Sequence, residues 1–296
     1  MKPVTVFFAM LTTLVSATSV ALADNADSHD EGKISAAAFE ASLHFQDGEI
    51  ALPNGMATLK LGKDFRYLPP ADAERVLVEA WGNPPGNETL GMVFPAHAGP
   101  TAKDAWGVVI TYDNDGHVAD TDANDINYDD LLKEMQDSIK ATNESRMQAG
   151  YGAMQLVGWA EKPYYDAKAN KLFWAKEIEF DGDTNHTLNY NVRVLGKGGV
   201  LVMNAVSAMN QLPIIKNDMR TLLADTEFNQ GNRYADFNPS VDKVAAYGLA
   251  ALVAGGIAAK TGLLAKLLVL ILAFKKIILL AIAGIGGVIW KFFKRK

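Results

Sequence analysis

The chain contains no cysteine among its 296 residues. Disulfide bonds, thiol nucleophiles, cysteine-ligated metals and lipid attachment through an N-terminal cysteine are therefore excluded. A folded domain of this chain must be stabilised by its hydrophobic core alone. Apolar residues make up 49 % of the sequence, and their excess lies at the two ends of the chain.

Acidic residues are absent from the C-terminal part. Residues 243–296 contain nine Lys or Arg and no Asp or Glu, whereas the segment between the two apolar ends carries all 34 acidic residues against 18 basic ones. A segment this acidic repels nucleic acid, so a nucleic-acid partner is excluded. The basic tail is attracted to anionic lipid, which makes membrane lipid a predicted partner.

The first residues are typical of a secretory signal peptide. Lys2 supplies the positive start, residues 4–15 are apolar, and Ala21-Leu22-Ala23 fits the cleavage pattern of small residues, which predicts a signal over 1–23. The alternative, an uncleaved anchor, is disfavoured by the Thr and Ser residues in this stretch. Residues 24–37 are small and polar and predict a disordered leader.

The end of the chain predicts a membrane anchor over 244–296, reached through a polar linker at 229–243. The second apolar run, 267–290, is long enough to cross about 30 Å of hydrocarbon, although two central lysines each cost about 2.5–3.5 kcal/mol there. The positive-inside rule favours one span in the bacterial inner membrane, with the closing KFFKRK cytoplasmic and the main domain in the periplasm or outside the cell. A two-span hairpin and a buried helical hairpin are the alternatives. The predicted membrane residues are Leu267, Ile271, Ile278 and Trp290.

The middle, residues 38–228, is predicted to be an α+β domain. Asn54-Gly55 between two strand-like runs predicts a β-hairpin in which both turn residues have positive φ. Apolar residues at helical spacing predict amphipathic helices at 70–81, 127–147 and 213–224. Strands are predicted at 89–94, 106–112, 154–160, 171–180, 187–195 and 200–208, the last four as an antiparallel meander. The fold class expected is an antiparallel sheet of hairpins with packed helices, as one domain or as two subdomains split near residue 150.

Several strings resemble one bacterial family, namely LPNGMATLKL, DFRYLPPADAERVLVEAWGNPP, WGVVITYDNDGHV, INYDDLLKEMQ, GWAEKPYYD, LFWAKEI and KVAAYGLAALVAGGIAAKTGL. They look like the family catalogued as domain of unknown function 2167, described as uncharacterised membrane-anchored proteins. The resemblance covers about residues 45–275 and implies an envelope location and a tail anchor. It supplies no catalytic residue and no cofactor. Residues 154–228 are also similar, at the level of fold, to PsbP-like domains, an analogy that does not fix function.

An acidic stretch between the second and third predicted strand groups is the candidate metal site. Clustered carboxylates suit Ca²⁺, but the spacing fails the EF-hand pattern, since Asp125 and Leu131 stand where glycine and glutamate are required. The alternative is a solvated loop whose last acids favour the start of the next helix. The candidate ligands are Asp113, Asp115, Asp120, Asp122 and Asp125.

Aromatic residues give a candidate binding surface. Aromatic side chains with polar tips are enriched at interfaces and ligand sites, although strand-face and hairpin packing is the favoured explanation. The surface would comprise Trp159, Tyr164, Tyr165 and Trp174, with the Arg66-Tyr67 corner as a second candidate.

Catalytic motifs are missing from the sequence: there is no HExxH, no GxSxG and no phosphate-binding loop leading into a helix. We therefore expect a membrane-anchored envelope protein that works by binding, with an envelope protein as partner and without a cofactor. The alternatives are a metal-assisted hydrolase that uses the acidic loop and a tail-based channel or lipid-sensing element.

Overall fold

The computed structural model describes residues 35–83, 85–102, 104–181, 184–224 and 226–255. The chain divides into two compact units, Met1–Ala254 and Gly255–Lys296, and the folded domain described below belongs to the first. The predicted signal peptide and the predicted membrane residues Leu267, Ile271, Ile278 and Trp290 lie outside the described residues. Within the described part, no helix is long and apolar enough to cross a membrane.

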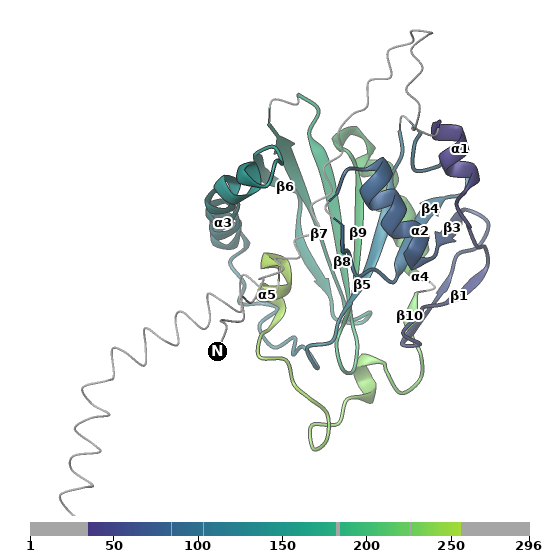
Figure 1. Ribbon diagram of the computed structural model, residues 1–296. Helices are drawn as coiled ribbons and strands as arrows, with labels where there is room; N and C mark the ends of the chain where they lie inside the picture. The colour runs from purple at the N-terminus through teal and green to yellow at the C-terminus, as the bar shows by residue number, and fades with distance from the viewer. Residues whose placement is uncertain (1–34, 84, 103, 182–183, 225, 256–296) are drawn as a thin grey trace, which may run out of the picture. The chain divides into compact units, whose positions relative to one another are not determined.

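A seven-stranded antiparallel sheet forms the centre of the domain, in the order β3-β4-β5-β9-β8-β7-β6 (Figure 1). Consecutive strands β6 to β9 pair as the predicted meander, and β9 then pairs with β5, so both halves of the chain share one sheet. The alternative of two subdomains is therefore not what the structure shows. The strands are β3 (Phe65–Leu68), β4 (Gly91–Pro95), β5 (Gly107–Asp113), β6 (Met154–Asp166), β7 (Lys171–Phe180), β8 (Thr187–Leu195) and β9 (Val200–Ala208).

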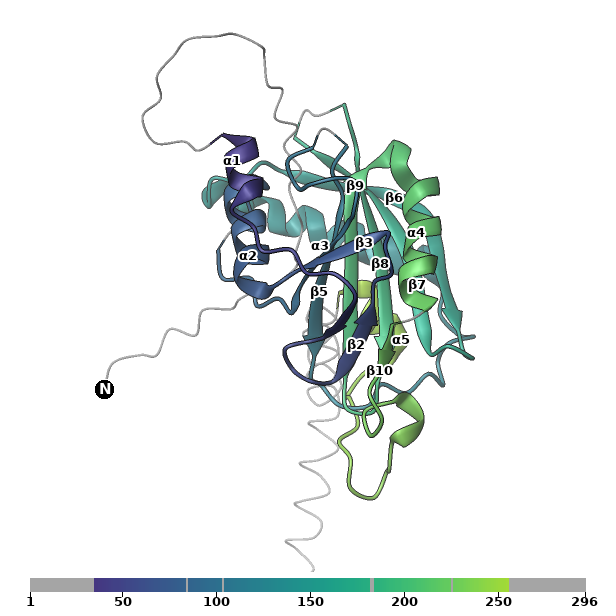
Figure 2. The ribbon, with the colours of Figure 1, turned by 90° about the vertical axis from the view of Figure 1, so that its right-hand side faces the viewer.

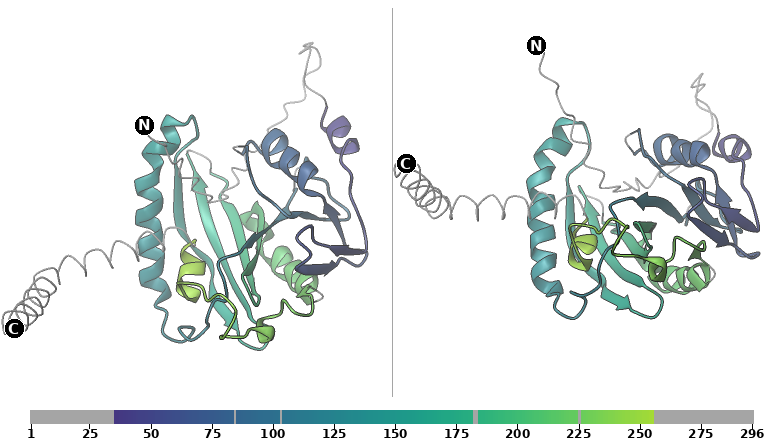
Figure 3. Two further views of the ribbon diagram at one scale, coloured as in Figure 1. Left: turned by 60° about the horizontal axis from the view of Figure 1, so that its bottom comes forward. Right: turned by 90° about the horizontal axis from the view of Figure 1, so that it is seen from below.

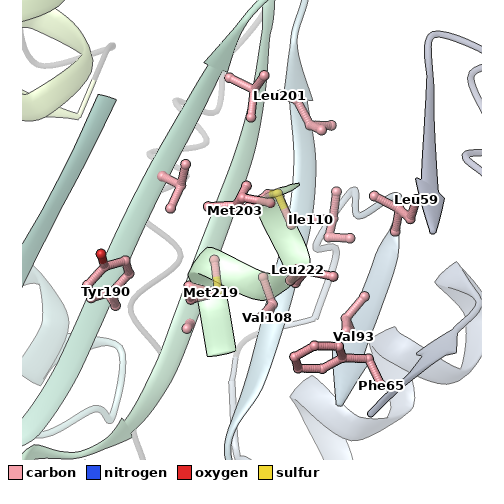
Figure 4. Close-up of a cluster of buried hydrophobic side chains, with 14 of the residues drawn as sticks. Leu59, Phe65, Val93, Val108, Ile110, Tyr190, Leu201, Met203, Met219 and Leu222 are labelled. Carbon is pink, nitrogen blue, oxygen red and sulfur yellow. The ribbon is translucent and has the colours of Figure 1, made fainter. Parts of the chain in front are cut away.

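Helix α4 (Leu212–Ala224) and a small sheet cover one face of the seven-stranded sheet. Figure 2 shows α4 on one side of the sheet and α1, α2 and α3 on the other. The apolar stripe of α4, which includes Met219 and Leu222, points at the strand residues (Figure 4). The small sheet has the order β1-β2-β10 and consists of β1 (Glu49–Ala51), β2 (Ala57–Lys60) and β10 (Glu227–Phe228).

Two separate groups of helices cover the opposite face. Helices α1 (Ala36–Ala41) and α2 (Pro70–Arg75), the latter continued by the π-helical turn η1 (Val76–Ala80), pack over β3, β4 and β5. Helices α3 (Tyr128–Gln148) and α5 (Leu249–Ala254) pack over β6, β7 and the adjoining ends of β8 and β9. Figure 3 shows the two groups at opposite ends of the same face, so the strands between them differ in their surroundings from the rest of the sheet.

Local sequence signals identify most elements correctly. The predicted strands 171–180, 187–195 and 200–208 match β7, β8 and β9, and the predicted helices match α2 with η1, α3 and α4 to within two residues. Asn127 caps α3 as a short polar side chain should, accepting from the backbone N–H of Asp129 at 3.1 Å. The α+β class with an antiparallel sheet is confirmed.

The predicted hairpin at Asn54-Gly55 exists, but its turn differs from the prediction. Strands β1 and β2 pair with Ile50 opposite Leu59, which confirms the hairpin. Only Gly55 has positive φ, at 67°, because the connection is longer than two residues. The backbone N–H of Gly55 bonds to the carbonyl of Leu52 at 2.8 Å, and the Asn54 side chain accepts from the N–H of Met56.

Two short elements near the start of the domain were absent from the prediction. Helix α1 begins at Ala36, inside the stretch 24–37 predicted to be a disordered leader, and Ser35 caps it. Strand β3 includes Arg66 and Tyr67, which the sequence suggested only as a corner. Both elements are too short for an apolar period to be recognised, so only their packing reveals them.

The segment 229–254, termed the C-terminal strap, is packed against the fold. The Tyr234 hydroxyl donates to the carbonyl of Val118 at 3.1 Å. His117 exchanges backbone hydrogen bonds with the strap: its N–H donates to the carbonyl of Lys243, and its carbonyl accepts from Ala245, both at 2.8 Å. The predicted linker 229–243 is therefore not a free tether, and the start of the predicted anchor, 244–254, is part of the domain. The folded unit ends at Ala254 rather than at residue 243.

Candidate functional site

Strand β8 is buried on both faces although its residues alternate between polar and apolar. Leu188, Tyr190 and Val192 face the α4 side and join its hydrophobic cluster. The alternate residues Asn189, Asn191 and Arg193 project to the opposite face, and they are 4 %, 2 % and 8 % exposed. A polar face on a strand normally contacts solvent, so its burial at the centre of the sheet requires an explanation.

The strand register brings further polar residues beside this row. In β7, Lys176 pairs with Asn189 and Trp174 pairs with Asn191, while Asn204 of β9 pairs with Asn191 on the other side. Directly paired residues of antiparallel strands share a face of the sheet. These residues therefore form one set, termed the central polar group, which consists of Trp174, Lys176, Asn189, Asn191, Arg193 and Asn204.

Hydrogen bonds connect the members of the central polar group. The Nη1 of Arg193 donates to the Oδ1 of Asn204 at 3.1 Å and to the carbonyl of Val192 at 3.0 Å. The side-chain amide of Asn191 donates to the Oδ1 of Asn189 at 2.7 Å and to the backbone carbonyl of Asn189 at 2.8 Å. The guanidinium of Arg193 lies over the ring of Trp174, with its Cζ 4.7 Å from the ring centroid, a cation–π geometry.

The group contains two cations and no carboxylate. Within the described residues, neither Arg193 nor Lys176 has an acidic side chain at ion-pair distance. Burial lowers the pKa of Arg193 to about 10, and the charge of Asp113 acts in the opposite direction. Burial also lowers the pKa of Lys176 to about 8, and the neighbouring charge of Arg193 adds to that effect. The interior of the sheet is therefore electropositive at this point.

Hydrogen-bond donors are in excess within the group. The indole Nε1 of Trp174 is buried without a partner, in a residue that is only 1 % exposed. The Nζ of Lys176 makes no hydrogen bond to the described part of the chain. An orphaned buried donor costs about 1–3 kcal/mol, so these groups are a place where acceptor atoms of a ligand would be stabilised. The arrangement can bind and orient an acceptor-rich molecule.

The predicted aromatic surface is divided between the two faces of the sheet. Trp174 belongs to the central polar group. Trp159 and Tyr165 of β6 instead fix neighbouring segments: the indole N–H of Trp159 donates to the carbonyl of Tyr128 at 3.2 Å, and the Tyr165 hydroxyl donates to Asp120 at 2.9 Å. Tyr164 is 61 % exposed and stacks on Phe173, a residue that packs against the cluster on the α4 face.

Arg66 and Tyr67 lie on β3, at the opposite end of the sheet from β6 and β7. The Arg66 guanidinium lies 3.8 Å from the ring centroid of Phe45, and the Tyr67 hydroxyl donates to the carbonyl of Leu90 at 2.6 Å. Both side chains stabilise contacts within their own part of the domain. The structure therefore does not bring this pair together with the aromatic residues of β6 and β7.

Two of the candidate metal ligands contact the C-terminal strap. Asp115 accepts from the Tyr247 hydroxyl at 2.7 Å, and Asp122 accepts from the backbone N–H groups of Leu249 and Ala250. Asp120 accepts from Tyr165, Asp113 ends β5, and Asp125 is exposed in the following turn. Among the described residues, no three His, Asp or Glu side chains are grouped to hold a metal ion. The hydrogen bonds to Asp115 and Asp122 join the acidic loop to the strap.

The sequence reasoning missed Lys176, Asn189, Asn191, Arg193 and Asn204. The available signal was the alternation TLNYNVRVL, which was interpreted only as a strand of a meander. Alternation of polar and apolar residues alone suggests that one face of the strand contacts solvent. Only the strand order, with β8 between β7 and β9 and helices over both flanks, shows that the polar face is enclosed.

Together these features define an α+β domain with one large antiparallel sheet and a polar, electropositive group within it. The chain belongs to the family described as "Protein of unknown function (DUF2167)", whose model matches residues 44–286. This match confirms the resemblance seen in the sequence motifs.

Two solved structures are similar to the chain at low identity. The solution structure of cyanobacterial PsbP (CyanoP) from Synechocystis sp. PCC 6803 has 12 % identity and a TM-score of 0.33, covering 64 % of this chain and 94 % of that one. The crystal structure of LpqN, described as involved in cell envelope biogenesis of Mycobacterium tuberculosis, has 11 % identity and a TM-score of 0.32, covering 67 % and 99 %. At these scores neither structure defines the function of this chain. No curated protein sequence matches it.

Proposed function

We propose that this protein is a ligand-binding module of the bacterial cell envelope, tethered to the membrane by its C-terminal tail. The observation that carries the binding function is the central polar group. A stable core would have apolar side chains at these positions, because replacing buried charges by packed hydrophobic residues is often neutral or stabilising by about 1–4 kcal/mol. Buried polar side chains with spare donors are instead what a ligand site requires.

The envelope location and the tether rest on the two ends of the sequence. The start of the chain has the pattern of a secretory signal, and the tail combines a long apolar run with basic residues only. Membrane lipid is the partner that this tail fits. Alkaline extraction of membranes, combined with protease treatment of intact cells lacking an outer barrier, tests this part of the proposal. Extraction of the protein by alkali would overturn the tether.

Native mass spectrometry tests the binding function directly. The full-length protein would be purified in an uncharged detergent from cells that produce it naturally, and the mass of any retained small molecule would be measured. We expect a bound molecule in the wild-type protein and its loss in Asn191→Leu, because this substitution keeps the side-chain volume and removes a polar anchor of the group.

A matched control is Asn83→Leu, which changes another buried asparagine. Asn83 is 8 % exposed and donates to the carbonyl of Leu77, far from β8 in the fold. The control should retain the bound molecule. A wild-type protein without any bound molecule, or equal retention in both variants, would argue against a binding site at the central polar group.

A further inference from the structure

Arg193 and Lys176 lie on adjacent strands and project to the same face of the sheet. Lys176 pairs with Asn189, which is four residues before Arg193 on β8, so only the row of asparagine and tryptophan side chains separates them. An uncompensated buried charge costs several kcal/mol, and buried cations in proteins are normally paired with an anion. Two such cations therefore point to a missing anionic partner.

The only acidic residue that affects Arg193 electrostatically within the described part is Asp113, which belongs to β5 and pairs with Val200 of β9. Its charge attracts that of Arg193, but one carboxylate does not balance two cations. The local charge thus remains positive with both cations protonated, and a ligand carrying at least one negative charge would balance it.

We propose that the ligand of the central polar group carries a phosphate group, which Arg193 and Lys176 bind. This inference rests on the proposed binding function. The planar guanidinium presents a fork of donors that matches phosphate oxygens, and the lysine adds a point charge. A phosphate offers more acceptor oxygens than a carboxylate does, and it would thereby use the spare donors of the group, including the unpaired indole N–H of Trp174.

Lys176 is partly exposed, whereas Arg193 is 8 % exposed and Asn191 is 2 % exposed. The phosphate would enter past the lysine and reach the arginine, which is held by Asn204 and Trp174. Desolvation at Arg193 strengthens an ionic hydrogen bond there relative to one on the surface.

Two sources of phosphate are distinguished by the experiment, namely a soluble phosphate ester and a phospholipid headgroup. Full-length protein in an uncharged detergent would be titrated calorimetrically with inorganic phosphate and with glycerol 3-phosphate. A third titration would use mixed micelles containing phosphatidylglycerol. Acetate and glucose serve as carboxylate and neutral probes. Binding of a soluble probe supports the first source, and binding only of the lipid supports the second.

Variants connect binding to the two cations. Arg193→Met and Lys176→Met should each weaken phosphate binding at least about tenfold, the loss expected for a charge-assisted hydrogen bond. Lys168→Met, an exposed lysine in the turn after β6, is the control and should bind like the wild-type protein. Thermal unfolding would verify that each variant is folded. If Arg193→Met does not fold, the affinity of Lys176→Met for phosphate decides the test.

The phosphate inference and the binding function fail in different ways. If no phosphate probe binds at millimolar concentration, or if both cation variants bind as the wild-type protein does, the phosphate inference is overturned. If acetate binds as well as phosphate does, the ligand chemistry is simply anionic and the inference also fails. In each case, a molecule retained by the wild-type protein and lost in Asn191→Leu would still support the binding function.

Discussion

The carboxylate of Asp122 accepts a hydrogen bond at 3.1 Å from the backbone N–H of Leu249, the first residue of α5. Its second oxygen accepts from the N–H of Ala250 at 3.2 Å. The acidic loop thus caps a helix that is distant in sequence but next to it in the fold. Because the first N–H groups of a helix have no partner within the helix, this contact ties the C-terminal strap to the domain.

We expect Asp122→Ala to lower the free energy of unfolding by about 1 kcal/mol, the usual cost of losing a helix cap. Urea unfolding of the full-length protein in detergent would measure the loss, and hydrogen exchange should increase in α5 first. Asp125→Ala is the control, because that carboxylate is exposed three residues further along the same loop. Equal stability of the two variants would contradict the capping role.

The ring of His117 stacks on two aromatic rings of the strap. Its centroid lies 4.3 Å from that of Tyr234 and 3.8 Å from that of Phe237. Burial lowers the pKa of His117, while the charges of Asp120 and Asp242 and nearby backbone carbonyls act in the opposite direction. The neutral imidazole is therefore the form that the folded protein favours.

This pKa shift makes the domain less stable in acid. Below the ordinary histidine pKa of about 6.5 the unfolded chain binds a proton that the folded chain resists, so stability falls as pH decreases through that range. We expect His117→Phe, which keeps the stacking, to remove this component of the pH dependence. His97→Gln, at an exposed position, should leave the profile unchanged. A profile unaltered by His117→Phe would contradict the assignment.

Lys176 predicts the same trend at alkaline pH. Its pKa in the folded protein, about 8, lies below the usual 10.5, so between these values the unfolded chain binds the extra proton and stability rises with pH. Arg193 is the charged neighbour that adds to this shift. Without ligand, Lys176→Met should therefore be more stable than the wild-type protein at pH 7 by up to about 3 kcal/mol, since one pKa unit corresponds to about 1.4 kcal/mol.

The gain from Lys176→Met should disappear above pH 10.5, where the lysine is neutral in both states. Urea unfolding at several pH values would measure it, with Lys168→Met as the exposed control. A loss of stability at pH 7 in Lys176→Met would instead mean that the ammonium group has a stabilising partner within the fold.

The elements with strong local signals could be predicted from the sequence. The meander strands have turn residues at both ends and apolar or alternating runs between them, and α3 has a cap at Asn127 followed by an apolar stripe. These signals depend on residues close together in the chain, so no tertiary information is needed to recognise them.

The candidate site depends on contacts that the sequence does not encode locally. Arg193 and Lys176 belong to different strands, and their common environment arises from the pairing of β7 with β8 and from the helices that enclose the face. Asp122 is a similar case. The N–H groups that it binds lie more than a hundred residues away in the sequence, so the sequence alone could not show this contact and suggested a metal ligand instead. Only the tertiary structure distinguishes a cap from a ligand.

The C-terminal boundary of the domain was predicted from hydrophobicity, and it illustrates a further ambiguity. An apolar run followed by basic residues is typical of a membrane segment, yet residues 244–254 pack into the domain, with Leu249, Leu252 and Val253 at most 2 % exposed. An apolar helix segment buried in protein has the same composition as one buried in lipid. The predicted anchor can therefore begin only after the strap.

This boundary leads to a prediction about shortened chains. A chain that ends after Ala254 retains α5, whereas one that ends after Lys243 lacks the buried side chains of Leu249, Leu252 and Val253 and exposes the cluster beneath them. Each such side chain contributes about 1.5–3 kcal/mol when fully buried, so the shorter chain should lose most or all of its stability. Circular dichroism on heating and limited proteolysis would compare the two.

The longer chain should show a cooperative transition and resist proteolysis. The shorter one should be cleaved first around β6 and α3, which pack in the same hydrophobic cluster as α5. Equal melting temperatures would show that α5 adds nothing to the domain. In that case the hydrogen bonds that Asp115 and Asp122 accept would add no stability, and residues 244–254 could serve as the beginning of a membrane segment.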